Sequence, residues 1–430
     1  MGAGRGNKLG SVPSSPTIRA ARGVRDILPP ERWRWRQVES AAHELARRYG
    51  FEELETPIIE PAELIERGVG EGSDAGGKEL YRLLSQGRSQ ASLVLRPEAT
   101  AGVMRAYHEG HLDLGPQPQR LYSLGSMFRH DRPQAGRYRQ FHQFNVEVLG
   151  SNAAAIDAEL IEMGWEWLHG LGLNGLRMEL NSIGDETCRP AYLVLLRSYY
   201  RPLKERLCAD CQRRLEDNPL RLLDCKRPEC REQSGGAPRI IDHLCPPCQE
   251  SIAEVRRLLE AAGIPYRLEP TLVRGLDYYT RTVFEYQLDS LDGAQSALGG
   301  GGRYDGLAKA LGFPDTAGSG FAMGLERIVL SLPPGPAPAP AIELLVLPAE
   351  GVEAEAAARL TRLARTRVAA AADHSPRSLK AKMRSAARSG ARWVAMVDPA
   401  EASAGRVRLR RMDSGEQSEL SWEEMVEVLG

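Results

Sequence analysis

Residues 272–285 read Leu-Val-Arg-Gly-Leu-Asp-Tyr-Tyr-Thr-Arg-Thr-Val-Phe-Glu and lie in a longer stretch, residues 271–287, that we predict to be a strand. The end of this run is rich in β-branched and aromatic residues, which are typical of strands. In an extended chain Tyr278 and Tyr279 would point to opposite faces. By itself the pattern fits a binding site and a half-buried strand with tyrosines at its margin equally well.

A second segment, residues 127–143, lies between strands expected at residues 121–124 and 143–149. It contains four arginines, three aromatic residues and a Pro/Gly turn. An arginine fork suits phosphate oxygens, and an aromatic ring such as Phe141 can stack on a base. Because the flanking strands are apolar and the loop is long, a binding function is favoured over a solvated basic hairpin.

Two other segments carry weaker signals. Residues 95–102 place Glu98 and Thr100 at the end of a strand, where they could bind an ammonium group. Taken alone, Thr100 is better explained as the N-cap of the following helix. Residues 299–306 and 318–327 are rich in glycine, which permits close approach of a ligand to the backbone, and the second ends with Arg327 before an apolar run.

Together these segments resemble the class II aminoacyl-tRNA synthetases and, among them, the histidyl-tRNA synthetases. Phe128-Arg129 with residues 137–141 resembles the arginine-bearing second motif of class II, and residues 324–327 resemble its third motif. Residues 274–279 and 302–306 resemble the two signatures of the histidine enzymes, and residues 22–29 resemble their N-terminal opening. The resemblance runs from about residue 22 to the end of the chain.

The resemblance implies an enzyme that activates L-histidine with ATP and Mg²⁺, transfers it to tRNA(His), and forms a homodimer. The implied catalytic residues are Arg129 and Arg274, on two sides of the α-phosphate, and Arg327, on the terminal phosphate. Arg137 and Phe141 complete the implied ATP site, together with Arg129 and Arg327. The implied histidine-binding residues are Glu98, Ala99, Thr100, Arg129, Gln143, Glu147, Arg274, Tyr278 and Tyr279. A pocket that satisfies both imidazole nitrogens rejects isosteres.

The implied fold is an α+β class II synthetase catalytic domain, an antiparallel sheet with flanking helices, plus a C-terminal α/β anticodon-binding domain. The catalytic domain contains an inserted, mostly helical domain. We expect a flexible tail over residues 1–20, the catalytic domain over 21–333 with the insertion at 185–266, a Pro-rich linker over 334–341, and the anticodon-binding domain over 342–430. The linker is the sharpest boundary, because residues 332–341 contain five prolines.

The C-terminal region is basic although the chain as a whole is nearly neutral, with 56 basic and 57 acidic residues. Residues 359–411 contain 14 basic and three acidic residues, a local net charge of +11. We predict that one helical face presents Arg377, Lys380, Arg384 and Arg388 to tRNA. A solvated helix face is the alternative. A strand expected between residues 369 and 373 is shortened, which is a departure from the pattern of the family in the anticodon-binding domain.

The composition, with 42% hydrophobic and 26% charged residues, is that of a globular protein. No run of 18 apolar residues is present, so no membrane partner is expected. Seven cysteines, an odd number, favour a reducing compartment, and we expect a cytoplasmic protein. Residues 1–20 lack the apolar core of a secretory signal. A disordered tail is the preferred interpretation, and a transit peptide is the alternative.

Two other functions and a metal site stay open at this point. A non-catalytic regulatory subunit of ATP phosphoribosyltransferase shares the core, but the intact Arg274 signature and the basic C-terminal region favour the enzyme. An RNA-binding protein without catalysis leaves Glu98, Gln143 and Glu147 unexplained. The pairs Cys208/Cys211 and Cys245/Cys248 could together bind one zinc ion, and adenylation would then survive its loss. Incidental thiols are the alternative, and we assign no metal ligands.

Overall fold

The computed structural model describes residues 18–70, 79–84, 92–291, 296–335 and 341–430. The chain divides into two compact units, Met1–Gly335 and Pro336–Gly430. Much of the expected N-terminal tail, of the glycine-rich stretch after residue 70 and of the Pro-rich linker lies outside the described residues. Among the described helices, we find none that is both long and apolar enough to cross a membrane.

The first unit is built on an eight-stranded sheet that is antiparallel except at its edges, where β1 pairs with β4 and β6 pairs with β7 in parallel. In spatial order the strands are β1 (Glu52–Glu53), β4 (Gln119–Phe128), β5 (Gln140–Leu149), β10 (Gly318–Gly324), β9 (Ala297–Arg303), β8 (Thr280–Leu288), β6 (Leu176–Ser182) and β7 (Arg267–Leu268). A small second sheet pairs β2 (Ile59–Pro61) with β3 (Leu93–Leu95).

The helices of this unit pack on the two sheets and on one another through buried apolar faces. The main ones are α1 (Pro29–Arg48), α2 (Ala62–Val69), α3 (Thr100–Glu109), α4 (Ala154–Gly170) and α10 (Leu325–Ser331), with α9 (Leu307–Ala310) a single turn. Two prolines begin α1, where their missing N–H groups cost nothing. In α4, Asp157 forms a fully buried ion pair of 2.7 Å with Arg303 of β9, so this signature arginine fixes the helix to the sheet.

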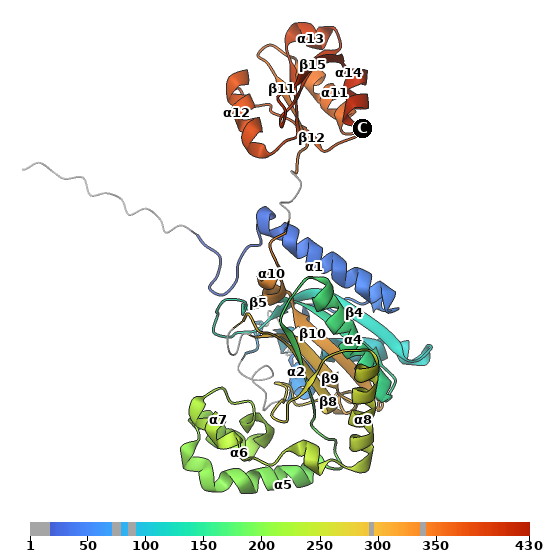
Figure 1. Ribbon diagram of the computed structural model, residues 1–430, viewed down its shortest axis with the longest axis vertical. Coiled ribbons are helices and arrows are strands. Elements are labelled where there is room, and N and C mark those ends of the chain that lie inside the picture. The colour runs from blue at the N-terminus through green and yellow to red at the C-terminus, as the bar shows by residue number, and fades with distance from the viewer. Residues whose placement is uncertain (1–17, 71–78, 85–91, 292–295, 336–340) are drawn as a thin grey trace, which may run out of the picture. The chain divides into compact units, whose positions relative to one another are not determined.

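The insertion is helical, as predicted. It contains α5 (Arg189–Tyr200), α6 (Ala209–Asp217), α7 (Pro228–Ser234) and α8 (Pro246–Ala261), with 3-10 turns at Arg201–Arg206, Pro219–Leu222 and Ile240–His243. Figure 1 shows α5, α6 and α7 grouped at the end of the unit away from α1. Buried Tyr192, Leu196 and Leu215 join this group to the main core.

One predicted strand is wrong in its first half. β8 begins at Thr280, whereas residues 271–279 form turns. Arg281 adopts a left-handed φ of 49°, and the pairing of β8 with β9 shifts register between Thr280 and Val283. These two irregularities end the ladder, so the chain that carries Tyr278 and Tyr279 leaves the sheet.

The second unit is a five-stranded sheet in the order β12-β11-β13-β14-β15 with helices on both faces. Its elements are β11 (Leu344–Pro348), α11 (Ala354–Ala364), β12 (Ala370–Ala372), α12 (Leu379–Ser389), β13 (Trp393–Val397), α13 (Pro399–Ser403), β14 (Arg406–Arg411), β15 (Gln417–Ser421) and α14 (Trp422–Leu429). α11 and α14 cover one face and α12 covers the other. The strand expected between residues 369 and 373 is present as β12, three residues long.

Candidate active site

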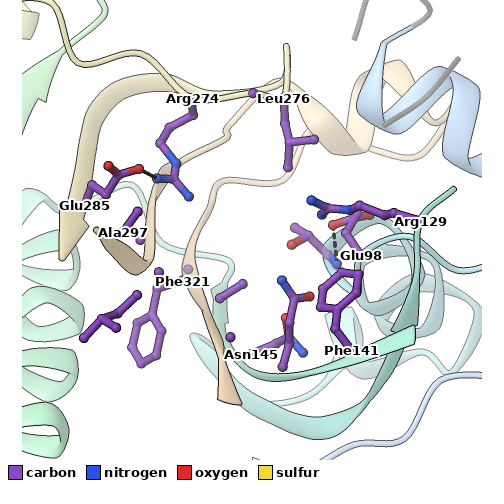
Figure 2. Close-up of a pocket in the computed structure, with 18 of the residues that line it drawn as sticks. Glu98, Arg129, Phe141, Asn145, Arg274, Leu276, Glu285, Ala297 and Phe321 are labelled. Atoms are coloured by element: carbon purple, nitrogen blue, oxygen red, sulfur yellow. Dashed lines mark hydrogen bonds and ion pairs between the residues drawn. The ribbon is translucent and has the colours of Figure 1, made fainter. Parts of the chain in front are cut away.

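A cavity of about 340 Å³ opens over the middle of the eight-stranded sheet, between β5, β8, β9 and β10. It brings together every site residue that the sequence predicted in this unit except Ala99. Its lining includes Glu98, Thr100, Arg129, Arg137, Phe141, Gln143, Glu147, Arg274, Tyr278, Tyr279 and Arg327. Ala99 is buried in the core beside it. Figure 2 shows Arg129 and Arg274 on opposite sides of the cavity.

Arg129 follows the last residue of β4 and is held in place by its neighbours. Its Nε donates to the carbonyl of Pro97 at 2.9 Å, and its guanidinium lies 5.2 Å from the ring centre of Phe141. Burial lowers the pKa of Arg129, and the carboxylates of Glu79 and Glu98 partly offset this shift. The cavity therefore contains a desolvated cation with an aromatic ring beside it, which suits a nucleotide.

Arg274 and Arg327 add two further cations. Arg274 Nη1 lies 2.5 Å from Glu285 Oε2, while its Nε finds no hydrogen-bond partner among the described residues. Arg327, in the first turn of α10, donates through Nη1 to the carbonyl of Ala297 at 2.5 Å and through Nε to that of Gly136 at 3.3 Å. A guanidinium has five N–H donors, and the anchoring contacts described here occupy only one nitrogen of Arg274 and two of Arg327, so donors are left for an anion in the cavity.

Glu98, rather than Thr100, caps α3. Its carboxylate accepts the backbone N–H of Thr100 at 2.7 Å and that of Ala101 at 3.0 Å. The Thr100 side chain makes no capping bond, and its hydroxyl instead donates to Glu147 Oε1 at 2.7 Å. The N-cap interpretation of Thr100 is therefore wrong, because the helix begins at Thr100 itself and Glu98 already supplies the acceptor.

Glu147 lies on β5 and is almost fully buried. Its carboxylate accepts hydrogen bonds from the hydroxyl groups of Thr100 and Tyr304, and Tyr304 lies in the loop after β9. Burial raises the pKa of Glu147 to about 8; the two hydroxyl donors oppose this shift and nearby Glu98 adds to it. A carboxyl with such a pKa can accept a proton from a bound ligand near neutral pH.

Tyr278 and Tyr279 lie on the same side of the chain instead of opposite faces. Their ring centres are 4.7 Å apart, and the ring of Tyr278 meets that of Tyr304 edge-on at 5.6 Å. Both residues precede β8, so the alternation of a strand does not apply to them. The result is a cluster of three tyrosines in the cavity lining, and one of them, Tyr304, is hydrogen-bonded to Glu147.

Asn145, Glu285 and Tyr304 are among the lining residues that escaped prediction. Asn145 falls between Gln143 and Glu147 on β5, and alternation along a strand was a usable signal for it. The side-chain carbonyl oxygens of Gln143 and Asn145 are buried. In the part of the chain that the structure describes, neither of them accepts a hydrogen bond. They are free to accept from a ligand.

Gly320 on β10 makes room for Glu147, and this gives a first prediction. A Cβ there would lie 1.8 Å from Glu147 Oε2 and 2.4 Å from the carbonyl oxygen of Val146. We expect Gly320→Ala to lower the free energy of unfolding by about 1–3 kcal/mol, as overpacking does, measured by urea denaturation. Gly306→Ala is the control, since a Cβ at Gly306 meets nothing within 4 Å. Equal stabilities of the two variants would contradict the packing described.

The predicted basic face of the second unit needs one correction. Lys380, Arg384 and Arg388 lie on α12 at intervals of four residues, and all three are exposed. Arg377 precedes the helix, whose N-cap is Ser378, and its guanidinium pairs with Asp373 at 2.9 Å. Arg377 therefore does not lie on the helical face, because the chain turns at Ser378.

The cysteines also group differently from the single site considered. One group contains Cys208, Cys211, Cys225 and Cys230, and the other contains Asp185, Cys188, Cys245 and Cys248. The two CxxC pairs fall in different groups, so one site built from both pairs is wrong.

The first unit has an antiparallel sheet with arginines and buried carboxylates over its centre, and a separate α/β unit follows it. This combination defines a class II aminoacyl-tRNA synthetase. The comparisons agree. A histidyl-tRNA synthetase family model matches residues 23–184 and 242–328, and an anticodon-binding domain model matches residues 343–430. The predicted fold class is confirmed.

Individual relatives narrow the class. The histidine–tRNA ligase of Desulforudis audaxviator is 47% identical over 421 residues, which cover 96% of this chain and 98% of that one. That of Moorella thermoacetica is 46% identical over 403 residues, covering 93% and 95%. The crystal structure of apo S. aureus histidyl-tRNA synthetase matches with a TM-score of 0.79 and 32% identity, covering 96% of this chain and all of that one. The chain belongs to the histidyl-tRNA synthetase family.

Proposed function

We propose that this chain, a histidine–tRNA ligase, activates L-histidine with ATP in the cavity over the sheet and passes the histidyl group to tRNA(His). The histidine carboxylate attacks the α-phosphate, pyrophosphate leaves, and the acyl group then moves to the tRNA with release of AMP. The observation that carries this proposal is the set of three partly anchored arginines and two buried carboxylates around one cavity.

The arginines serve ATP. Negative charge on the α-phosphate is spread during an in-line displacement, so fixed cations on two sides stabilise the transition state. Arg129 and Arg274 lie on opposite sides of the cavity and suit this role. Arg327 at the start of α10 suits the terminal phosphate, and Phe141 the adenine ring, with Arg137 at the exposed rim. ATP enters as its magnesium complex, so Mg²⁺ is part of the substrate.

The other wall serves histidine. Glu98, Thr100 and Gln143 provide acceptors for the substrate ammonium group, and Ala99 supports them from the core. A neutral imidazole has one donor and one acceptor nitrogen. Glu147 is placed to accept from the N–H, and Tyr279 to donate to the other nitrogen, with Tyr278 beside it. An amino acid that lacks either group would leave one of these buried polar groups unpaired.

The test of this function is ATP–pyrophosphate exchange with each amino acid in turn. We expect exchange that depends on histidine alone. A regulatory subunit of ATP phosphoribosyltransferase would give none, and exchange that is equal with other amino acids would overturn the histidine assignment. Arg274 and both signature tyrosines line the cavity, which favours the enzyme over the regulatory subunit.

The C-terminal unit is proposed to bind tRNA, and residues 343–430 match an anticodon-binding domain model. Deletion of residues 341–430 should leave pyrophosphate exchange intact and impair charging, because the adenylation cavity is lined by residues 79–327 alone. Exposed Lys380, Arg384 and Arg388 on α12 form the proposed contact, with Arg377 just before the helix. Unchanged charging by the shortened chain would refute this role.

Single substitutions on α12 test the contact more finely. We expect Lys380→Ala, Arg384→Ala or Arg388→Ala to weaken tRNA binding and to reduce the slope of log affinity against log salt by about 0.7–0.9, as loss of one phosphate contact does. Filter binding at several salt concentrations measures both quantities. Arg362→Ala is the control, because exposed Arg362 lies on α11 at the other face of the sheet. An equal change in the control would contradict a specific α12 surface.

A homodimer is proposed from exposed apolar residues around the small β2–β3 sheet. Ile58, Ile59, Leu83 and Leu93 are each more than one-third exposed. Exposed apolar residues gathered around one small sheet are typical of protein interfaces. Sedimentation equilibrium should give twice the chain mass of 47.3 kDa, and Ile59→Asp should shift it toward the monomer. A monomeric wild-type chain would contradict the proposal.

A cytoplasmic location is proposed because none of the seven cysteines is in a disulfide.

A further inference from the structure

Seven cysteines and one aspartate of the insertion form two tight groups of four potential metal ligands. In each group the ligand atoms all lie within 4.8 Å of one another. The first, called the α6 group, contains Cys208, Cys211, Cys225 and Cys230, and the second, called the α8 group, contains Asp185, Cys188, Cys245 and Cys248. None of the seven thiols is in a disulfide.

The geometry of the α6 group suits a tetrahedral ion. Cys208 Sγ and Cys225 Sγ are 4.0 Å apart. Zinc–thiolate bonds of about 2.3 Å at tetrahedral angles separate two sulfurs by about 3.8 Å, whereas a disulfide needs about 2.05 Å. The backbone N–H of Cys208 points at Cys230 Sγ at 3.2 Å, a donor that stabilises a thiolate. Three of the four side chains are buried.

The α8 group has the same spacing with one carboxylate. Cys188 Sγ lies 3.9 Å from Cys248 Sγ, and Cys245 Sγ lies 3.7 Å from Asp185 Oδ1. Arg281 Nε, 3.5 Å from Asp185 Oδ2, supplies positive charge beside the group. Zinc accepts thiolate sulfur and carboxylate oxygen together.

Each CxxC pair surrounds the start of a helix. Cys208 is the N-cap of α6 and Cys245 is the N-cap of α8, and in both pairs the second cysteine lies in the first turn. The partial positive charge of a helix N-terminus favours the thiolate form that metals bind. Sequence-distant residues then complete each group: Cys225 and Cys230 for the first, and Asp185 and Cys188 for the second.

We propose that the insertion binds two structural zinc ions, one in the α6 group and one in the α8 group. In each site four protein ligands fill all positions, so neither ion takes part in the chemistry. Residues 185–241, which contain the whole α6 group, lie outside the match to the synthetase family model. Each ion would link the N-terminus of one helix, α6 or α8, to two ligands from another part of the insertion.

The α6 site also bears on the active site. Residues 212–224 form a loop closed at its two ends by the ligands Cys211 and Cys225. From this loop Asn218 Nδ2 donates to Asp277 Oδ1 at 2.7 Å, and Arg221 Nη1 donates to the carbonyl of Gly275 at 3.1 Å. The loop thus positions the segment that carries Arg274. Loss of zinc from this site should therefore slow adenylation, in contrast to the expectation from sequence that adenylation would survive.

Metal analysis of the full chain, purified without chelator under reducing conditions, tests the proposal. We expect two zinc ions per chain in the wild type, one in Cys225→Ser, one in Cys248→Ser and none in the double variant. Asp210→Asn is the control and should keep both ions, because exposed Asp210 lies between two ligands without being one. A wild-type content near zero would overturn both sites. If the wild type contained one zinc ion and a single variant kept that ion, the site which that variant removes would be overturned.

Cobalt substitution answers the same question without variants, in case a cysteine change prevents folding. Apo-protein titrated with Co²⁺ should bind two equivalents and develop a thiolate-to-cobalt charge-transfer band with tetrahedral d–d absorption. Cysteine coordination would be overturned if the charge-transfer band were absent, or if the titration gave only the weak d–d absorption of octahedral cobalt. Neither readout depends on histidine activation, so failure of the metal sites and failure of the proposed reaction remain distinguishable.

Discussion

Replacing Arg274 with histidine should lower the rate of histidine-dependent pyrophosphate exchange by about 10²–10³-fold and leave the Kd of histidine nearly unchanged. At pH 8 the new side chain is neutral and shorter than arginine. The charge lost is one that the proposed reaction needs mainly when the α-phosphate becomes five-coordinate. An interaction made only in the transition state affects turnover and not substrate binding.

The structure supports this separation of effects. Arg274 is held by Glu285 at 2.5 Å and leaves its Nε without a partner among the residues described. It lies across the cavity from Arg129 and away from Glu98, which we assign to the substrate ammonium group (Figure 2). Preorganised donors of this kind cost no reorganisation during the reaction, which is why removing one has a large effect.

The control for Arg274→His is Arg257→His on α8. Arg257 is exposed, pairs with Glu254 on its own helix, and is not among the residues that line the cavity. It should leave both the exchange rate and histidine binding unchanged. Stopped-flow binding and exchange measured on the same preparations separate the two effects. A rise in the Kd of histidine with unchanged turnover would assign Arg274 to ground-state binding instead.

Local sequence patterns predicted most of the elements and many of the lining residues. Alternation along β5 places Gln143, Asn145 and Glu147 on one face, and the structure directs all three into the cavity. On α1, for example, Trp33 is 37% exposed whereas Trp35 is fully buried. Spacing defines a helix, but which side faces the core depends on what packs against it.

Long-range contacts account for the rest. Tyr304 reaches Glu147 from 157 residues away, and Arg274, which lies outside the sheet, comes close to Gly300 of β9. No local pattern specifies such contacts, because they follow from the strand order. The same holds for the cysteines: Cys248 is paired with Cys188, 60 residues earlier, rather than with the nearer CxxC pair. Similarity to a family supplied roles that spacing alone did not.

Glu147 should make the stability of the unliganded protein depend on pH. Burial raises its pKa to about 8 from an ordinary value of 4.5, so the folded state holds a proton that the unfolded state has lost between these pH values. The stabilising contribution is complete below about pH 4.5 and disappears as the pH rises through 8. Its slope is at most about 1.4 kcal/mol per pH unit.

Glu147→Gln removes this titration and keeps the shape of the side chain. Urea denaturation at pH 5.5, 6.5 and 7.5 should show a wild-type free energy of unfolding that falls relative to that of the variant as the pH increases. Glu254→Gln, on the exposed face of α8, is the control and should follow the wild type. Parallel curves for the wild type and Glu147→Gln would contradict a protonated Glu147 in the folded state.

The same carboxyl should couple histidine binding to pH. If the imidazole N–H donates to Glu147, the carboxylate is the form that binds, and binding lowers its pKa by linkage. The Kd of histidine measured by calorimetry should then fall as the pH rises from 7 toward 8, by up to about tenfold per unit. In Glu147→Ala the imidazole N–H loses its acceptor, so the Kd should be higher by about 5–150-fold, the equivalent of the roughly 1–3 kcal/mol cost of an unpaired group, and its pH dependence over this range should be weaker. Wild-type affinity in the variant would show that the imidazole is recognised elsewhere, with Glu147 serving only to hold Thr100 and Tyr304 in place.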